Sequence, residues 1–153
     1  MLSKLDVNHG VAGFLLANGA LNADGDEAAI RRKILENDKV EAIIVLPRDM
    51  FYTTDISVTL WILNMNKEAG EKTGRKLRDR RGEVLFIDLR MWNENIEKYT
   101  YDKNKNKKKT VLTPEQIARV KDIFESWRCV DGGYEDVPEL CKSVHIKGDD
   151  SDQ

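Results

Sequence analysis

The sequence is poor in the residues that build metal centres and disulfide frameworks. Its 153 residues include two cysteines and two histidines. Cys129 and Cys141 have no further ligand at the spacing of a zinc site, and His9 and His145 lie far from each other in the sequence. We therefore expect two reduced thiols and no bound metal, which is the usual state of a cytoplasmic protein.

Long apolar runs and a strong excess of either charge are also missing. No segment approaches the roughly 18 apolar residues of a transmembrane helix, and the N-terminal MLSKLDVNHG has no apolar core of a signal peptide. The formal net charge of -2 provides no overall attraction to nucleic acid. A hydrophobic content of 41% in 153 residues predicts one ordinary globular domain in the cytoplasm.

Motifs that hold phosphates or activate nucleophiles are absent too. No glycine-rich loop follows an expected strand, and the glycines of GVAGF lie inside an apolar run. No GxSxG or Walker motif occurs. Asp88 follows the apolar residues LFI, at a strand end where catalytic carboxylates are often found. A single carboxylate without a partner is, however, more commonly a turn residue.

The residues that are present alternate between apolar runs and polar segments, as is typical of an α/β fold. The run at 11–17 predicts a strand buried on both faces, 27–37 predicts a helix, and 40–46 predicts a second strand. Together they form a βαβ unit with a parallel strand pair. The link to a third strand at 56–63 is too short for another helix, so this strand is expected to run antiparallel to a neighbour. The sheet should be mainly parallel, with the antiparallel strand near its end.

The second half of the chain is more polar. A fourth strand is expected at 83–89, between polar linkers at 65–82 and 90–112. Thr113, Pro114 and Gln116 then provide the capping box and first turn of a helix that ends near Arg128. The acidic residues 129–153 are expected to form a partly disordered tail, with the final GDDSDQ disordered. This divides the chain into a domain of residues 1–128 and a tail of residues 129–153.

Several separated blocks of the sequence carry a family resemblance. They are GVAGFLLANGALN, DGDEAAIRRKILENDKVEAIIVLPRDMFYTTDISVTLWILN, VLFIDLR, LTPEQIARVKDIFESWR and GYEDVPELCKS. In this order they resemble the later part of the modification (M) subunit of type I restriction-modification systems. Those subunits are adenine-N6 DNA methyltransferases. The resemblance covers residues 2–145, which is nearly the whole chain.

The resemblance implies part of the Rossmann-like sheet of an S-adenosylmethionine-dependent methyltransferase. Residues 11–17, 40–46 and 56–63 would be the fifth, sixth and seventh strands of that sheet. The seventh strand would be antiparallel and inserted beside the sixth. The strand at 83–89 and the C-terminal helix would be additions to this partial sheet.

The resemblance also implies that two functional motifs lie upstream. The family has a glycine-rich cofactor loop and a catalytic Asn-Pro-Pro-aromatic motif, whereas the prolines here, Pro47, Pro114 and Pro138, are not adjacent. We therefore expect no catalytic residue and no S-adenosylmethionine site in this chain. It would be a partial adenine-specific DNA methyltransferase subunit, inactive alone. The alternative is a non-enzymatic module, derived from a methyltransferase, that binds DNA or a partner subunit.

Phe51 and Tyr52 lie between the second and third expected strands. The resemblance implies that this segment faces the target-base pocket, where an aromatic ring packs on a flipped adenine. Phe51 is the first candidate and Tyr52 the second. The alternative is that either ring plugs the end of the sheet. The family often has Gly-Ile-Pro where this chain has Asp55-Ile56-Ser57, which changes the shape of the loop.

Two basic segments are candidates for DNA-phosphate contacts, which depend on salt and read no sequence. The first contains Lys72, Arg75, Lys76, Arg78, Arg80 and Arg81. A solvated, flexible loop is the commoner explanation of such a run. For KNKNKKK, residues 103–109, that explanation is stronger, because asparagines and no aromatic residues interleave the lysines.

The partners implied by the resemblance are DNA and the specificity and restriction subunits of the same system, with no membrane. Base reading would belong to the specificity subunit. The strand at 11–17 would lack its usual neighbour, the fourth strand, and would therefore have an open edge. We expect the chain to self-associate through this edge, or to pair there with a complementary N-terminal half of the methyltransferase.

Overall fold

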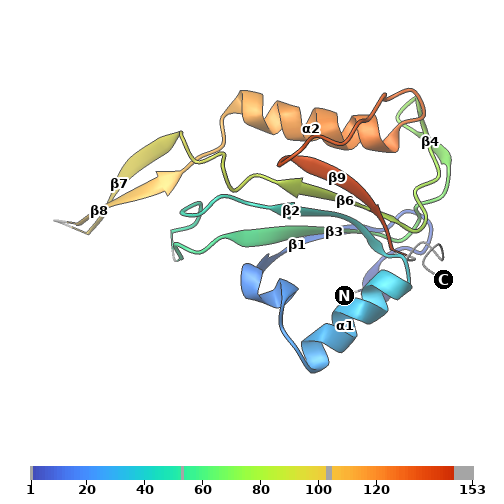
Figure 1. Cartoon of the computed structure of the whole chain (residues 1–153), viewed down its shortest axis with the longest axis horizontal. Coiled ribbons are helices and arrows are strands. Elements are labelled where there is room, and N and C mark those ends of the chain that lie inside the picture. Colours follow the sequence, from blue (N-terminus) through green and yellow to red (C-terminus); the bar gives the residue numbers. More distant parts are fainter. Residues whose placement is uncertain (1, 53, 103–104, 147–153) are drawn as a thin grey trace.

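The computed structural model describes residues 2–52, 54–102 and 105–146, and it is built around one five-stranded sheet (Figure 1). The order of the strands across the sheet is β1-β3-β2-β6-β9. Their bounds are Val11–Ala17 (β1), Val40–Val45 (β2), Val58–Asn64 (β3), Glu83–Asp88 (β6) and Cys141–His145 (β9). The helix α1 (Asp26–Glu36) covers one face of the sheet and α2 (Pro114–Arg128) covers the other (Figure 1).

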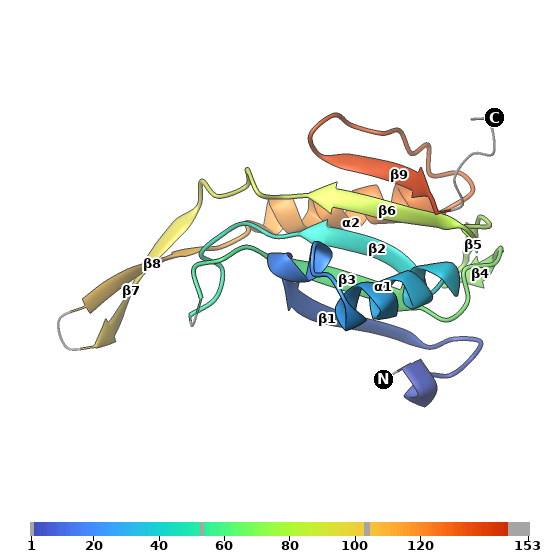
Figure 2. The ribbon, with the colours of Figure 1, turned by 60° about the horizontal axis from the view of Figure 1, so that its bottom comes forward.

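Four shorter strands form two hairpins outside the sheet. β4 (Gly70–Lys72) pairs with β5 (Arg75–Leu77), and β7 (Ile96–Asp102) pairs with β8 (Lys105–Thr110). Two 3-10 turns, η1 (Leu2–Lys4) and η2 (Asn18–Leu21), flank β1. The β7–β8 hairpin projects from one end of the sheet, and β4 lies at the opposite end (Figures 1 and 2).

The direction of β3 confirms the prediction of an antiparallel third strand. β3 pairs antiparallel with β1 on one side and with β2 on the other. Strands β1 and β2 therefore run in the same direction, as predicted for the βαβ unit, but β3 separates them. The prediction of a mainly parallel sheet is wrong, because among the described strands only β2 and β6 form a parallel pair. The short link after β2 forces the chain to turn back, and β9 also pairs antiparallel with β6.

The core has two layers, one on each face of the sheet. On the α2 face, alternate residues of β2 and β6 are buried against Trp127 of the helix: Ala42, Ile44, Leu85 and Ile87. On the α1 face, Val40, Ile43, Trp61, Leu63 and Val84 pack with Ile34 and Leu35 of α1. Both faces are covered because side chains of a strand alternate between the two sides.

Strand β1 is not buried on both faces, which corrects the prediction for residues 11–17. Val11 and Leu15 remain 46% and 47% exposed, whereas Phe14 packs in the core with its ring centroid 6.2 Å from that of Trp61. The physical reason is the position of β1 at the edge of the sheet. The apolar run therefore predicts a strand here, but it does not show how many faces of that strand are covered.

Local signals predicted the helix α2 accurately. Thr113 Oγ1 accepts a hydrogen bond from the amide of Gln116 at 3.1 Å, and the Gln116 side chain accepts one from the amide of Thr113 at 2.9 Å. This reciprocal pair is the predicted capping box, with Pro114 at the first helical position. The strand predicted at 83–89 is likewise confirmed as β6.

Three strand-forming segments were missed. The polar linker at 65–82 contains β4 and β5, the polar segment at 90–112 contains β7 and β8, and residues 129–153 contain β9. Thr73 and Gly74, with φ of 51° and 75°, form the two-residue turn between β4 and β5. Polar strands are stabilised by the strands that they pair with. The β-propensity of one segment carries no information about its pairing partner. The final GDDSDQ, predicted to be disordered, lies outside the described residues.

Buried charges join the linker at 65–82 to the sheet. Arg80 and Glu41 are 1% and 2% exposed, and Arg80 Nε lies 2.9 Å from Glu41 Oε1. Asn64 Nδ2 donates to the second oxygen of Glu41 at 2.8 Å. Lys67, 3% exposed, donates to the Asp38 carboxylate and to the carbonyl oxygens of Val40 and Glu83. The charges are thus compensated inside the protein.

We expect Glu41→Gln to lower the free energy of unfolding by about 3–5 kcal/mol, because it leaves the Arg80 guanidinium buried without its counter-charge. Urea denaturation measures this difference. Glu68→Gln is the matched control, since Glu68 is 61% exposed in its pair with Arg81 and should cost less than about 1 kcal/mol. Equal losses in the two variants would contradict a structural role for the buried pair.

Candidate nucleic-acid interface

The loop at residues 46–57, between β2 and β3, presents aromatic side chains at one end of the sheet. Its two ends are tied together, because the amide of Leu46 donates to the Val58 carbonyl oxygen at 2.9 Å and Ser57 Oγ donates to the Leu46 carbonyl oxygen. Arg48 Nε also donates to the Asp55 carbonyl oxygen, at 3.2 Å. The loop is therefore closed at its base.

Phe51 and Tyr52, at the tip of this loop, have different surroundings. Phe51 is partly buried and packs against the core on the α2 face. Tyr52 is 55% exposed. The centroid of its ring lies 4.8 Å from that of Tyr99 in an edge-to-face arrangement. Lys109 Nζ lies 4.3 Å from the same ring, at cation–π distance. One ring thus contributes to the core and the other to the surface.

The β7–β8 hairpin docks on this loop. The amide of Thr110 donates to the Asp49 carbonyl oxygen at 2.8 Å, and Lys107 Nζ lies 3.7 Å from a carboxylate oxygen of Asp55. At the base of the hairpin, the amide of Val111 donates to the Asn95 carbonyl oxygen at 3.0 Å. The loop and the β7–β8 hairpin therefore lie at the same end of the molecule (Figure 2). Their contacts join lysines and tyrosines of three separate segments there.

The six basic residues predicted at 72–81 lie elsewhere, at the opposite end of the sheet with β4 and β5 (Figure 1). Lys72 and Lys76 are exposed. Arg75 reaches Glu125 at 3.3 Å, and Arg81 reaches Asp79 at 2.6 Å. The structure therefore does not bring this basic segment together with Phe51 and Tyr52.

Two of the six basic residues, Arg78 and Arg80, make ion pairs with carboxylates of the sheet. Arg78 lies 2.7 Å from Glu83, and its guanidinium carbon lies 4.9 Å from the centre of the Trp127 ring. Arg80 is buried against Glu41. The side-chain hydrogen bond from Arg81 lowers the pKa of Asp79 to about 2, so this carboxylate keeps its charge and compensates the neighbouring arginine.

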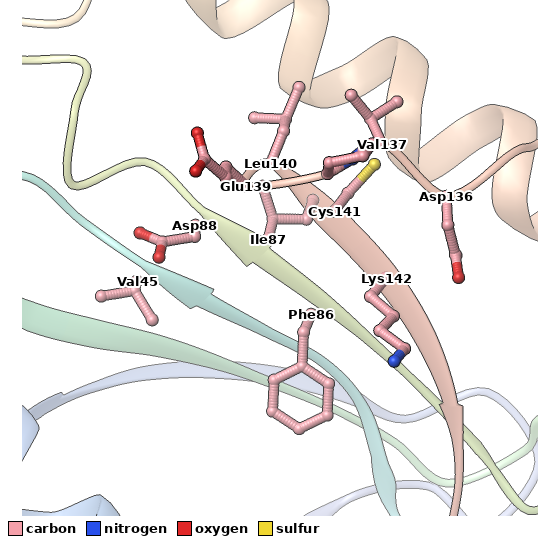
Figure 3. Close-up of a pocket in the computed structure, with 11 residues that line it drawn as sticks. Val45, Phe86, Ile87, Asp88, Asp136, Val137, Glu139, Leu140, Cys141 and Lys142 are labelled. Carbon is pink, nitrogen blue, oxygen red and sulfur yellow. The ribbon is translucent and has the colours of Figure 1, made fainter.

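A shallow cavity of about 500 Å³ lies between β6 and residues 136–142 (Figure 3). Phe86, Asp88, Glu139 and Lys142 are among the residues that line it. Asp88, the last residue of β6, accepts hydrogen bonds from the backbone amide and side chain of Arg90, so its carboxylate caps the turn that follows the strand. The hydrogen bonds from the Arg90 side chain also hold the pKa of Asp88 below its usual 3.8.

The side chains gathered around the loop at 46–57 are basic and aromatic. Within the described ranges, no three His, Cys, Asp or Glu side chains gather closely enough to hold a metal ion. None of the helices in the described part of the chain is long and apolar enough to cross a membrane. The lysines and tyrosines around the loop at 46–57 can instead attract anions and pack against aromatic rings. Sequence reasoning found Tyr52, but it missed Tyr99 because β7 was not predicted.

Comparison with known proteins yields a consistent set of relatives. Residues 1–150 match the family described as N-6 DNA Methylase. The type I restriction enzyme HindI methylase subunit of Haemophilus influenzae is 34% identical over 148 residues, 96% of this chain and 28% of the relative. The MjaVII methylase subunit of Methanocaldococcus jannaschii is 33% identical over 120 residues, 78% of this chain and 18% of the relative.

A solved structure agrees with the sequence relatives. The type I restriction-modification system methyltransferase subunit from Streptococcus thermophilus superposes with a TM-score of 0.65 at 25% identity. The superposition covers 93% of this chain and 24% of that subunit. This chain therefore spans 18–28% of the length of these three proteins.

Proposed function

Because this chain belongs to the N-6 DNA Methylase family, we propose that it is the C-terminal part of the catalytic domain of a type I adenine-N6 DNA methyltransferase subunit. The observation that carries this proposal is the match of residues 1–150 to the family. The chain covers 28% of the HindI subunit, which supports a part of a methyltransferase subunit rather than a whole one.

The strand arrangement supports a place in a partial Rossmann-like sheet. We propose β1, β2 and β3 as its fifth, sixth and seventh strands, since β3 is antiparallel and inserted between the other two. The strand β6 and the helix α2 would be additions. Residues 1–128 would form the catalytic-domain part, and residues 129–153 an acidic extension that includes β9.

The described residues do not fit an S-adenosylmethionine site. The turn after β1 is the 3-10 turn η2, and Arg31 closes it by donating to the carbonyl oxygens of Ala20 and Ala23. This arrangement places no glycine-rich loop of free amides at the carboxyl end of β1. We therefore propose that the chain alone binds no cofactor and transfers no methyl group. In the family, the cofactor site and the catalytic motif would be supplied by other residues.

Phe51 is our first candidate for packing against a flipped adenine, with Tyr52 as the second. Both lie on the loop at the carboxyl end of β2, and Tyr52 is already exposed. A base stacked on an aromatic ring contributes roughly 1–3 kcal/mol. The burial of Phe51 against the core supports the alternative, in which this ring closes the end of the sheet.

DNA is the proposed substrate of the intact subunit, and the specificity and restriction subunits are its proposed partners. Lys72, Arg75, Lys76 and Arg81 are the residues of the basic segment whose side chains are exposed enough for phosphate contacts. Arg78 and Arg80 are held by Glu83 and Glu41, so we expect them to contribute through the fold. Base reading would belong to the specificity subunit.

A second candidate function is a non-enzymatic DNA- or subunit-binding module derived from a methyltransferase. The lysines of β8 beside the loop at 46–57 favour it, because an exposed amine such as that of Lys108 can bind phosphate without any cofactor site. The two functions differ in how tightly this chain alone should bind DNA. A binding module should have a dissociation constant for DNA below roughly 10⁻⁶ M, the tight end of non-specific binding. A fragment that carries only part of the DNA-binding cleft of a methyltransferase should have a dissociation constant above it.

The first prediction of the proposed function concerns ligand binding. Titration calorimetry of the chain with millimolar S-adenosylmethionine should show no saturable heat, because the described residues build no cofactor loop. A labelled DNA duplex should bind weakly and in a salt-dependent way. Saturable one-to-one binding of the cofactor would overturn the proposal of a partial subunit.

The second prediction separates base packing from sheet plugging. Phe51→Leu retains an apolar side chain in the core but removes the aromatic face. It should weaken binding of an adenine-containing single strand by about fivefold or more if the ring stacks on a base. Tyr52→Leu is the matched variant for the second candidate, and fluorescence anisotropy measures both. Unchanged affinity in both variants would support the plugging alternative.

The third prediction concerns the open edge of β1. Val11 and Leu15 are exposed on this strand, and Asn18 Oδ1, just after it, is buried with no hydrogen-bond partner among the described residues. We propose that the edge pairs with a second copy or with a complementary N-terminal half. Light scattering should show a mass that rises with concentration.

The variant Leu15→Lys should shift the chain toward monomer, since charge on an edge strand opposes pairing. The control Ile117→Lys introduces the same charge on α2, at a side chain that is 56% exposed, and should leave association unchanged. A clean monomer for the unaltered chain, with the amides of 11–17 protected from hydrogen exchange, would argue against the open edge.

A further inference from the structure

The two faces of the β7–β8 hairpin have different roles. The register places Tyr99 opposite Lys107 and Glu97 opposite Lys109, so these four side chains share one face. This is the face that docks on the loop at 46–57, through the Tyr99–Tyr52 ring contact and through Lys107 and Lys109. The hairpin is therefore held through this face. On the other face Thr110 is buried near the base of the hairpin, whereas Lys98 and Lys108 are exposed.

The other face carries an unfavourable charge pair. Lys98 lies directly opposite Lys108, and both side chains are exposed. Among the side chains that the structure describes, no carboxylate lies within 4.0 Å of either ammonium group, and the ion pair recorded for this hairpin is that of Lys107 with Asp55. Like charges at directly opposed positions of an antiparallel pair destabilise it. A bound anion between the two side chains would convert this repulsion into two favourable contacts.

We propose that Lys98 and Lys108, on the exposed face of the β7–β8 hairpin, bind the phosphate backbone of DNA beside the loop at 46–57. This site rests on the proposed function, because that function supplies DNA as the ligand. A two-stranded ribbon is narrow enough to lie along or in the major groove of a duplex. The contacts would position the DNA without reading its sequence.

Lys98 and Lys108 differ from lysines in a flexible solvated loop, because their hairpin is docked on the loop at 46–57. The amide of Thr110 anchors β8 to the Asp49 carbonyl oxygen, and Tyr52 anchors β7 through Tyr99. The two lysines are therefore carried by a hairpin held in a fixed place relative to the aromatic tip of the loop. A phosphate bound there would hold the neighbouring strand close to Phe51 and Tyr52, which are the proposed base-packing residues.

The test is a double variant, Lys98→Gln with Lys108→Gln, in the full 153-residue chain. Fluorescence anisotropy with a labelled duplex over a series of salt concentrations gives the slope of log affinity against log salt. The slope should fall by about 0.9 for each lost phosphate contact, and the affinity near 0.1 M salt should fall roughly tenfold or more. Lys33→Gln with Lys121→Gln removes the same charge from exposed positions on α1 and α2, and should leave the slope unchanged.

Each outcome decides the proposal. Equal losses in the two double variants would overturn the hairpin site but leave DNA binding, and hence the proposed function, in place. If the unaltered chain binds no DNA at low salt, both the hairpin site and the proposed function lose their support. Binding of polyglutamate in place of DNA would overturn the site and indicate an acidic protein partner.

Stability measurements keep the result interpretable. Removing two like charges should leave the urea midpoint of the Lys98/Lys108 double variant equal to or above that of the unaltered chain. Equal or higher stability together with weaker DNA binding supports the phosphate site. A lower midpoint would show that the lysines hold the hairpin together, and would overturn it.

Discussion

The structure depends on the hydrogen bonds that β3 makes along both of its edges. Trp61, 2% exposed, is opposite Phe14 of β1 and opposite Ile43 of β2. Its indole nitrogen donates to Thr59 Oγ1 at 3.1 Å, so the one polar atom of this ring is satisfied inside the sheet. Because β3 runs back between β1 and β2, the loop before it must lie at the end of the sheet where β2 finishes. The position of Phe51 and Tyr52 follows from that return.

Basic residues in this protein serve two different purposes, and composition does not separate them. Arg80 is part of a run that looks suited to phosphates, yet it is buried against Glu41 and joins a linker to the sheet. Lys98 and Lys108 are exposed and opposed, and no carboxylate lies close to them among the side chains that the structure describes. A buried guanidinium requires its counter-charge inside the protein, whereas a pair of exposed, opposed ammonium groups is suited to an external anion.

The lysines of 103–109 show which neighbours a local sequence pattern does not contain. No aromatic residue interleaves that run, which favours a solvated segment, and Lys103 itself lies outside the described residues. The aromatic rings come instead from Tyr99 on the paired strand and Tyr52 on a distant loop. A contact between residues that lie 47 positions apart follows from strand pairing and docking, and no local pattern contains it.

The sequence by itself determined the elements whose signals are local. The capping box around Thr113 starts α2, the apolar runs mark β1, β2, β3 and β6, and the short link after β2 requires an antiparallel return. Only the tertiary structure decided that β1 is exposed on one face, that β9 completes the sheet, and that Arg80 is internal. Capping and turn length act over a few residues, so the sequence displays them directly. Burial and strand pairing depend on which distant segment lies beside a given residue, and that is a property of the fold.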